Sequence, residues 1–222
     1  MPISVKQVQR LAGFELNALR ATQVLGEEFE KVKVPRTGTP VYDVNGTLLF
    51  YRLPLRLGRA FSGYADLGVH EALAEPLLAV GMGGAWDERA ILKEAAAAAR
   101  KRRRLLKFNS IRFVAYSFPK LALQYLLDGR EVLMLEWKTW TEVPPLASQR
   151  QQREPSNFER WSLIDDMPAE IKRARLRSFK KRQAIWATPA LSRLDPTVIM
   201  KKTFDLPKIV IKLKDTREVH YA

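Results

Sequence analysis

Basic side chains dominate the chemistry that this sequence could perform, and they gather in two runs. The first run is five consecutive bases, Arg100-Lys101-Arg102-Arg103-Arg104. Guanidinium and ammonium groups at this density neutralise phosphates or acidic side chains, and each neutralised phosphate releases counterions. The second run has seven bases, namely Lys172, Arg173, Arg175, Arg177, Lys180, Lys181 and Arg182. Both runs are therefore candidate binding residues for nucleic acid or for an acidic protein surface.

The charge of the chain is strongly one-sided along the sequence. Residues 1–100 carry 12 Lys and Arg against 11 Asp and Glu, whereas residues 101–222 carry 26 against 13. Nearly all of the formal net charge of +14 therefore belongs to the second part. Such an asymmetry favours contact with a polyanion or an acidic partner.

Each basic run also has a purely structural interpretation. Bases at the end of a helix complement its dipole, although five in a row exceed that need. The second run is predicted to lie on a helix from about Met167 to Trp186, capped by Asp166, with bases spread nearly all round it. That helix could be simply a solvated surface helix. Its narrow apolar stripe is expected to consist of Ile171, Ala174, Ile185 and Trp186.

Three aromatic residues near these runs could stack on the bases of a single-stranded nucleic acid. They are Phe108, Trp161 and Phe179. The alternative is that they belong to the hydrophobic core, as isolated aromatics usually do.

No complete catalytic or metal-binding constellation is apparent. His70 adjoins Glu71, but the two would point to opposite faces of a strand. Ser117 lacks the glycines of a nucleophile elbow, and Asp165-Asp166 is more simply a helix cap than an acid/base pair. The chain has no Cys, which excludes disulfides and thiolate chemistry. We therefore expect a non-enzymatic protein without a metal or cofactor.

The glycine-rich segment from Gly81 to Asp87 could hold a phosphate on the amides of the following helix. It lacks the Lys-Ser/Thr pair of a P-loop, and Asp87 and Glu88 place negative charge where the phosphate would lie. We interpret it as a tight turn and a helix cap, with an enzyme acting on a phosphorylated substrate as the weakest of three hypotheses.

Local patterns predict an order of helices and hairpins. Helices are expected from about Ser4 to Leu25 and from Asp87 to Arg104. Asn45-Gly46 predicts a type I′ hairpin within residues 41–51, and Asp128-Gly129 predicts a second hairpin. Further strands are expected at residues 63–69, 76–80, 110–118, 121–127, 131–137 and 208–214.

This order predicts an α+β fold: an antiparallel sheet built from hairpins with one packed helix, plus an N-terminal helix and a basic, partly extended C-terminal region. The expected parts are an N-terminal helix and connection (1–37), an α+β core domain (38–143) and a basic C-terminal arm (144–222). A polar, Pro-containing stretch at 148–157 is typical of a linker. Deletion of residues 147–222 is accordingly expected to leave a folded domain.

The sequence also bears on location. The longest apolar run, Pro76 to Met82, is far shorter than the roughly 20 residues of a membrane span. The N-terminus has no secretory hydrophobic region. Together with the lack of Cys, these features lead us to expect a cytoplasmic protein without a membrane span.

Residues 42–136 resemble the propeptide-like α+β domains that precede some papain-fold peptidases. The resemblance is carried by Tyr42-Asp43-Val44-Asn45-Gly46 leading into Phe50-Tyr51, and by Gly63-Tyr64, Pro76 to Val80 and Trp86-Asp87. It implies an inhibitor-like or docking module and carries over no peptidase activity.

The leading hypothesis is therefore a non-enzymatic structural or interaction subunit of a larger assembly, which docks through its basic C-terminal region. The alternative is a stand-alone peptidase-inhibitor-like or chaperone-like module whose sheet edge accepts an extended peptide.

Overall fold

The computed structural model describes residues 16–17, 31–33, 38–73, 77–82, 86–117, 120–145, 160–186 and 218–220. The chain divides into two compact units, each built from separate stretches of sequence. The first unit takes in Met1–Thr39, Phe50–Trp86 and Glu170–Ala222. The second takes in Pro40–Leu49 and Asp87–Ala169. Most of the helix expected at residues 4–25 and the whole strand expected at 208–214 lie outside the described residues.

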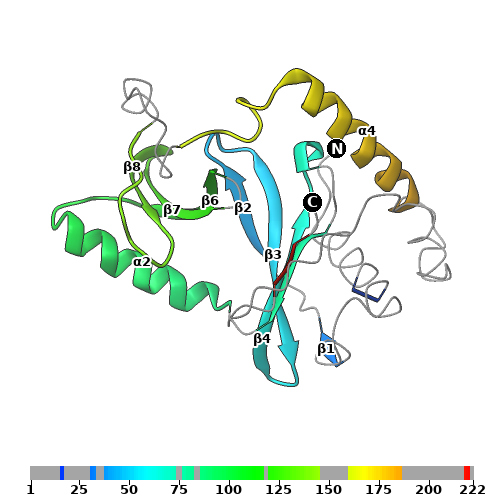
Figure 1. Cartoon of the computed structure of the whole chain (residues 1–222). Helices are drawn as coiled ribbons and strands as arrows, with labels where there is room; N and C mark the ends of the chain where they lie inside the picture. The colour runs from blue at the N-terminus through cyan, green and yellow to red at the C-terminus, as the bar shows by residue number, and fades with distance from the viewer. Residues whose placement is uncertain are drawn as a thin grey trace. The chain divides into compact units, whose positions relative to one another are not determined.

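The first unit is built on a long antiparallel hairpin (Figure 1). Strand β3 (Leu48–Leu57) and strand β4 (Ala60–Gly68) are joined by the two-residue turn Gly58-Arg59, with Gly58 at a φ of 63°. Strand β5 (Leu77–Met82) pairs with β4, and β9 (Glu218–His220) pairs with β5. The two-residue strand β1 (Val32–Lys33) pairs with the end of β3. A 3-10 turn, η2 (Glu71–Leu73), and helix α4 (Ala169–Trp186) complete the described elements.

A buried ion pair lies on the β3–β4 hairpin. Arg52 donates from Nε and Nη2 to the two carboxylate oxygens of Asp66, at 2.7 and 2.6 Å. The guanidinium carbon lies 4.1 Å from the Tyr64 ring centre and 4.7 Å from that of Trp86. Two hydrogen bonds and two aromatic faces together compensate the charge for its loss of water.

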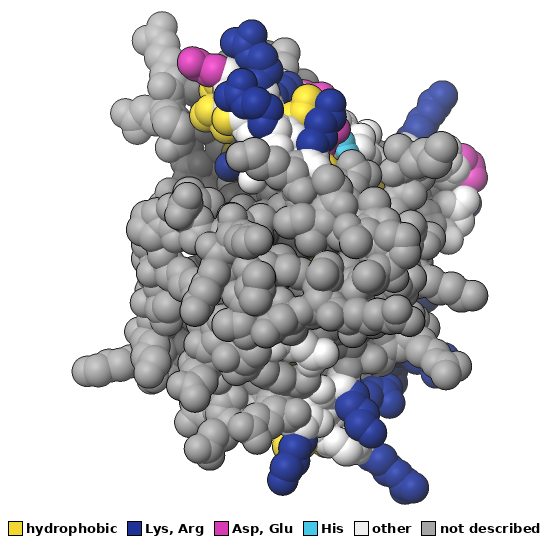
Figure 2. Space-filling model, turned by 90° about the vertical axis from the view of Figure 1, so that its right-hand side faces the viewer, with side chains coloured by type: hydrophobic (Ala, Val, Ile, Leu, Met, Phe, Trp, Pro, Cys, Tyr) yellow, Lys and Arg dark blue, Asp and Glu magenta, His cyan; other side chains and the backbone are white. Residues whose placement is uncertain are grey.

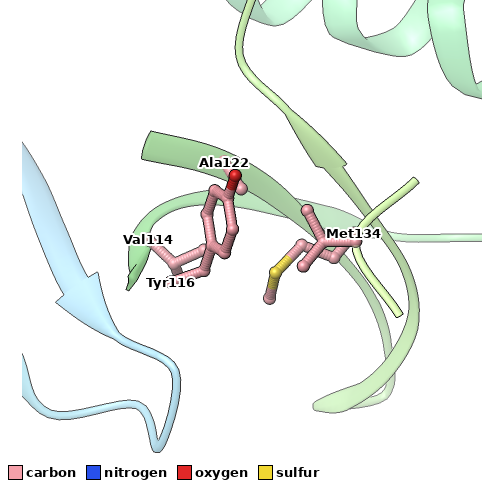
Figure 3. Close-up of a cluster of buried hydrophobic side chains, with 5 residues drawn as sticks. Val114, Tyr116, Ala122 and Met134 are labelled. Atoms are coloured by element: carbon pink, nitrogen blue, oxygen red, sulfur yellow. The ribbon is translucent and has the colours of Figure 1, made fainter. Parts of the chain in front are cut away.

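The second unit is a sheet with the strand order β8-β7-β6-β2, covered by one helix. Its strands are β2 (Thr39–Asp43), β6 (Ser110–Ser117), β7 (Lys120–Leu127) and β8 (Arg130–Glu136). Helix α2 (Glu88–Arg102) buries Ile91, Ala95 and Ala99, and the hydroxyl of Tyr125 on β7 donates to the carbonyl of Ala95 at 2.7 Å. Val114, Tyr116, Ala122 and Met134 form a core cluster with Val143 (Figure 3).

The α+β class is confirmed, but the expectation of a purely antiparallel sheet is wrong. Strand β2 pairs with β6 in parallel, with Val41 opposite Phe113 and Asp43 opposite Ala115. Tight turns impose antiparallel pairing only on strands that are neighbours in sequence. A long connection separates β2 from β6, so the chain can return in either direction.

The two predicted hairpin turns have different outcomes. Asp128 and Gly129 have φ values of 51° and 78°, as a type I′ turn requires, and the second hairpin is confirmed. In the first hairpin only Gly46 has a positive φ, at 91°. Gly46 N donates to Asp43 O and Asp43 N to Thr47 O, which makes a three-residue loop with glycine at its last position. The expected type I′ turn is therefore wrong there.

Residues 160–167 belong to the second unit and pack on its strands. The backbone amide of Trp161 donates to Tyr116 O at 2.9 Å, and its indole donates to the Ser117 hydroxyl at 2.7 Å. The carboxylate of Asp43, which is 0% exposed, accepts hydrogen bonds from the Ser162 hydroxyl and the Leu163 amide. This stretch was expected to belong to an extended arm, yet within the described part of the chain it supplies both hydrogen-bond donors of the Asp43 carboxylate.

The start of α4 also differs from the prediction. Asp166 was expected to cap a helix from about Met167, but the helix begins at Ala169. Asp166 instead closes the preceding turn, because its carboxylate accepts from Ser162 N at 2.7 Å and its amide donates to Ser162 O. Side chains of Asp compete for nearby backbone groups in this way when a turn precedes a helix.

Candidate nucleic-acid interface

Helix α2 carries the first basic run at its C-terminal end, and its start is fixed by Asp87. The Asp87 carboxylate accepts from the amides of Arg89 and Ala90, at 3.0 and 3.1 Å. The cap interpretation of this residue is thus confirmed. A carboxylate now occupies the position that a phosphate would need at this helix N-terminus.

Two residues of the first run are used inside the second unit. Arg103 is the C-cap of α2; its guanidinium pairs with Glu142 at 2.6 Å and also donates to Val132 O at 3.5 Å. Arg102 donates to Trp140 O at 3.2 Å. These contacts tie the helix end to the segment that follows β8.

All five residues of the run are exposed, and Arg100, Lys101 and Arg104 have none of the contacts that Arg102 and Arg103 make. Leu106 N donates to Arg103 O, so a closed turn follows the helix and carries Arg104. Lys107 beyond it is exposed too. The run is therefore split between two exposed bases with a structural contact and exposed bases that are left for binding.

The second basic run presents three bases along one side of α4. Arg173, Arg177 and Lys180 are exposed and follow at spacings of four and three residues. At about 100° per residue they lie within about 60° of one another, and the rise of 1.5 Å spreads them over about 10 Å. We call these three residues the α4 stripe. Figure 2 shows Lys and Arg side chains gathered at the height where α4 lies in Figure 1.

The opposite side of α4 is packed. Phe179 is 5% exposed, and Arg175 Nη1 donates to Ala72 O of η2 at 2.8 Å. Lys172 is half-buried. Bases therefore lie on more than one side of α4, but one side of the helix is occupied by contacts within the first unit.

The expected apolar stripe of α4 needs correction as well. Ile171 is 43% exposed and Ala174 is exposed, while the buried aromatic is Phe179. The side chains of Lys181, Arg182, Ile185 and Trp186 lie outside the described residues, although the helix continues through these positions.

The aromatics proposed for stacking on bases have other contacts. Phe179 is in the core, and Phe108 packs edge to face on Tyr125 with ring centres 5.2 Å apart. Trp161 is half-buried and holds Ser117 through its indole. The core interpretation holds for Phe179, and the other two rings serve packing within the second unit.

The remaining polar candidates also have local roles. His70 Nδ1 accepts from the Ala72 amide at 3.1 Å, at the start of η2. Asp165 accepts from Asn45 at 3.0 Å. In the described residues no group of three His, Asp or Glu side chains could hold a metal ion. No helix in that part of the chain has both the length and the apolar character needed to cross a membrane.

The edge of β8 that does not pair with β7 is covered by the segment that follows the strand. Val143 N donates to Met134 O at 2.9 Å, and Glu136 N donates to Thr141 O at 2.8 Å. Val132 O accepts from Arg103. The backbone positions 132, 134 and 136 alternate along one edge of the strand, and an added peptide would need those same groups. Sequence reasoning missed this feature, since it depends on the segment after β8 folding back.

No family model, curated protein or solved structure matches this chain. The resemblance of residues 42–136 to propeptide-like domains stays a prediction.

Proposed function

We propose that this protein is a non-enzymatic interaction subunit of a larger assembly and that it docks on nucleic acid through exposed basic residues. The α4 stripe carries the proposal. Three cations on one side of a helix are spread over about 10 Å, which spans about three nucleotide steps of a strand that rises about 3.4 Å per nucleotide. The packed opposite side holds that stripe toward solvent.

Arg100, Lys101 and Arg104 would add a second contact. Their neighbours Arg102 and Arg103 fix the end of α2 through Trp140 O and Glu142, so these three bases project from an anchored helix end. A fixed backbone at these positions reduces the entropy that binding must overcome. An acidic protein surface is the competing partner, because the same cations would pair with carboxylates.

The peptide-binding alternative has less support. It needs a sheet edge with unused main-chain groups, and positions 132, 134 and 136 of β8 are engaged. The β5 edge carries β9. The phosphate-substrate hypothesis is weaker too, because Asp87 occupies the amides at the start of α2.

A purification without nuclease tests the proposal most simply. The full-length protein is isolated from its native host at low salt, and the absorbance ratio and the co-eluting species are recorded by size exclusion. We expect nucleic acid that leaves the protein as salt rises. A peak that contains no nucleic acid but a stoichiometric acidic protein would contradict the proposal that the partner is a nucleic acid.

A further inference from the structure

The loop that follows β8 has a strained backbone. In the described part of the chain, three residues other than glycine have a positive φ: Asp128 at 51°, Lys138 at 78° and Trp140 at 55°. Asp tolerates this left-handed region, whereas Lys and above all the bulky Trp enter it at a conformational cost. Such strain is found mainly at binding and catalytic sites. Residues 137–140, which we call the tryptophan loop, are therefore a candidate binding site.

Glu136 holds the tryptophan loop in this conformation. Its backbone carbonyl accepts a hydrogen bond from Trp140 N at 3.0 Å. Its carboxylate accepts from the Thr139 hydroxyl at one oxygen and from the Tyr116 hydroxyl at the other, both at 2.7 Å. The fold itself thus sets the backbone of the loop, so a ligand would not have to order it.

The Trp140 ring is held by fewer contacts than two other tryptophans of the chain. The indole of Trp86 donates to the Thr39 hydroxyl at 2.8 Å. That of Trp161 donates to the Ser117 hydroxyl at 2.7 Å. Within the described residues the Trp140 indole makes no such bond, and the residue is half-buried. A partly exposed ring on a fixed backbone can stack on a planar ligand.

The basic end of α2 is joined directly to this loop. Arg102 Nη2 donates to Trp140 O at 3.2 Å. The next residue, Arg103, pairs with Glu142, which lies two residues beyond Trp140. Lys138 is exposed and adds a cation on the loop itself. An aromatic ring and several cations therefore share one end of the second unit.

The acidic residues near this surface are used inside the second unit. Residues 95–127, which include the whole first basic run, contain no Asp or Glu. The acids of residues 129–153 are Glu131, Glu136 and Glu142. Glu131 and Glu142 each pair with an arginine, and Glu136 accepts from two hydroxyls. Cations beside an aromatic ring are the combination with which proteins bind unpaired nucleic-acid strands.

We propose that the tryptophan loop binds single-stranded nucleic acid, with an unpaired base stacked on the Trp140 ring. Lys138, Arg104 and the exposed bases next to Arg104 contact the phosphates of that strand. In a duplex the faces of the bases are covered by their neighbours, whereas a single strand can present them to a ring. The inference rests on the proposed function for the class of partner and narrows it to an unpaired strand.

The first test compares two strands that have the same phosphates and differ only in their bases. The full-length protein is titrated with fluorescein-labelled oligothymidine and with a labelled abasic strand of the same length. The matched variants are W140F, which keeps a ring, and W140L, which is apolar without one. The wild-type protein should bind oligothymidine about 5- to 150-fold more tightly than the abasic strand. W140F should keep most of this preference and W140L should lose most of it. Equal preferences in the two variants would overturn the proposal.

The abasic strand also controls for misfolding. A misfolded variant would lose affinity for both strands, whereas a variant that has lost only stacking binds the abasic strand as tightly as the wild-type protein does. If W140L binds neither strand, K138Q decides, with K93Q as the matched change of an exposed base on α2. K138Q should lower the slope of log Kobs against log salt for oligothymidine by about 0.7, and K93Q should not. An unchanged slope in K138Q would then overturn the proposal.

The outcomes separate this inference from the proposed function. If neutralising the α4 stripe lowers the salt dependence of DNA binding while W140F and W140L behave alike, the tryptophan loop is refuted and the proposed function stands. Binding of duplex DNA without binding of single strands has the same meaning. The predicted loss of base preference in W140L without an effect of the α4 stripe would support the loop and contradict the role of α4. Absence of binding by the wild-type protein to single strands and to duplex would overturn both.

Discussion

The buried carboxylate of Asp43 accepts a hydrogen bond from the hydroxyl of Ser162, which lies 119 residues further along the chain. Leu163 N completes the pair of donors at 3.0 Å. A residue of the first hairpin is thereby joined to the segment that precedes α4. The segment 160–167 is thus a structural part of the second unit and not only a connection to helix α4.

Replacing Ser162 should destabilise the second unit. In S162A the Asp43 carboxylate keeps one donor and stays buried, and an unsatisfied buried group of this kind costs about 1 to 3 kcal/mol. Urea unfolding of the full chain measures the loss in the free energy of unfolding. The control is S110A, which changes an exposed serine and should alter stability by less than about 0.5 kcal/mol. Equal stability of the two variants would contradict the role of Ser162.

Deletion of residues 147–222 should lower the stability of the remaining chain, although the sequence alone predicts that a folded domain is left. The shortened chain loses Ser162 and Leu163 as partners of Asp43, and Arg160 as the partner of Glu131. We expect a broadened, lowered thermal melt, whereas a chain ending at residue 168 should keep those contacts. A sharp melt of the shorter chain at the temperature of the longer one would restore the simpler model of an independent arm.

Gly81 should not tolerate a side chain. A Cβ atom there would lie 2.8 Å from Tyr64 Cε1, and the Tyr64 ring packs on the Arg52 guanidinium. G81A should therefore cost about 1 to 3 kcal/mol through overpacking. A double-mutant cycle with Y64A tests the cause, because G81A should cost much less once the ring is absent. Additive effects would show that the ring is not the obstacle.

Stability should fall at alkaline pH because two tyrosines are buried in the second unit. Burial raises the pKa of Tyr125, and burial together with the hydrogen bond to Glu136 raises the pKa of Tyr116. Below a pH of about 10 the two tyrosines keep their protons in both the folded and the unfolded state. Above that pH they ionise first in the unfolded state, and the free energy of unfolding falls by about 1.4 kcal/mol per pH unit for each tyrosine. Y125F should lose about 1 kcal/mol at pH 7, because the bond to Ala95 O is gone, and show a shallower decline above pH 10. The measurement is the free energy of unfolding of the wild-type protein and of Y125F at several pH values. An equally steep loss of stability above pH 10 in both proteins would argue against this account.

The first basic run should divide into structural and binding members. R103Q removes the pair with Glu142, a largely exposed contact worth about 0 to 1 kcal/mol, and also the donor to Val132 O. R104Q removes an exposed charge next to it. We expect R103Q to lower the unfolding midpoint more than R104Q, and R104Q to reduce the salt slope of DNA binding by about 1 with unchanged stability. An unchanged salt dependence of DNA binding in R104Q would contradict a role of the first basic run in binding nucleic acid.

The sequence predicts the locally determined features well. The Asp128-Gly129 turn and the Asp87 cap depend on residues within one turn, and both are confirmed. The parallel pairing of β2 with β6 and the Asp43–Ser162 bond depend on distant segments, which local periodicity does not encode. The basic helix illustrates the same limit, since composition identifies its charge while the buried Phe179 and the Arg175–Ala72 bond decide which bases face solvent.

The most direct test of the central claim is the salt dependence of DNA binding by the full-length protein with the α4 stripe neutralised. The variant carries R173Q, R177Q and K180Q, and R89Q/K93Q/R130Q removes the same charge elsewhere. Loss of three phosphate contacts should lower the slope of log Kobs against log salt by about 2 to 3, with an unchanged thermal melt. An unchanged slope in the stripe variant, or an equal fall in the control, would contradict the proposal that α4 binds nucleic acid.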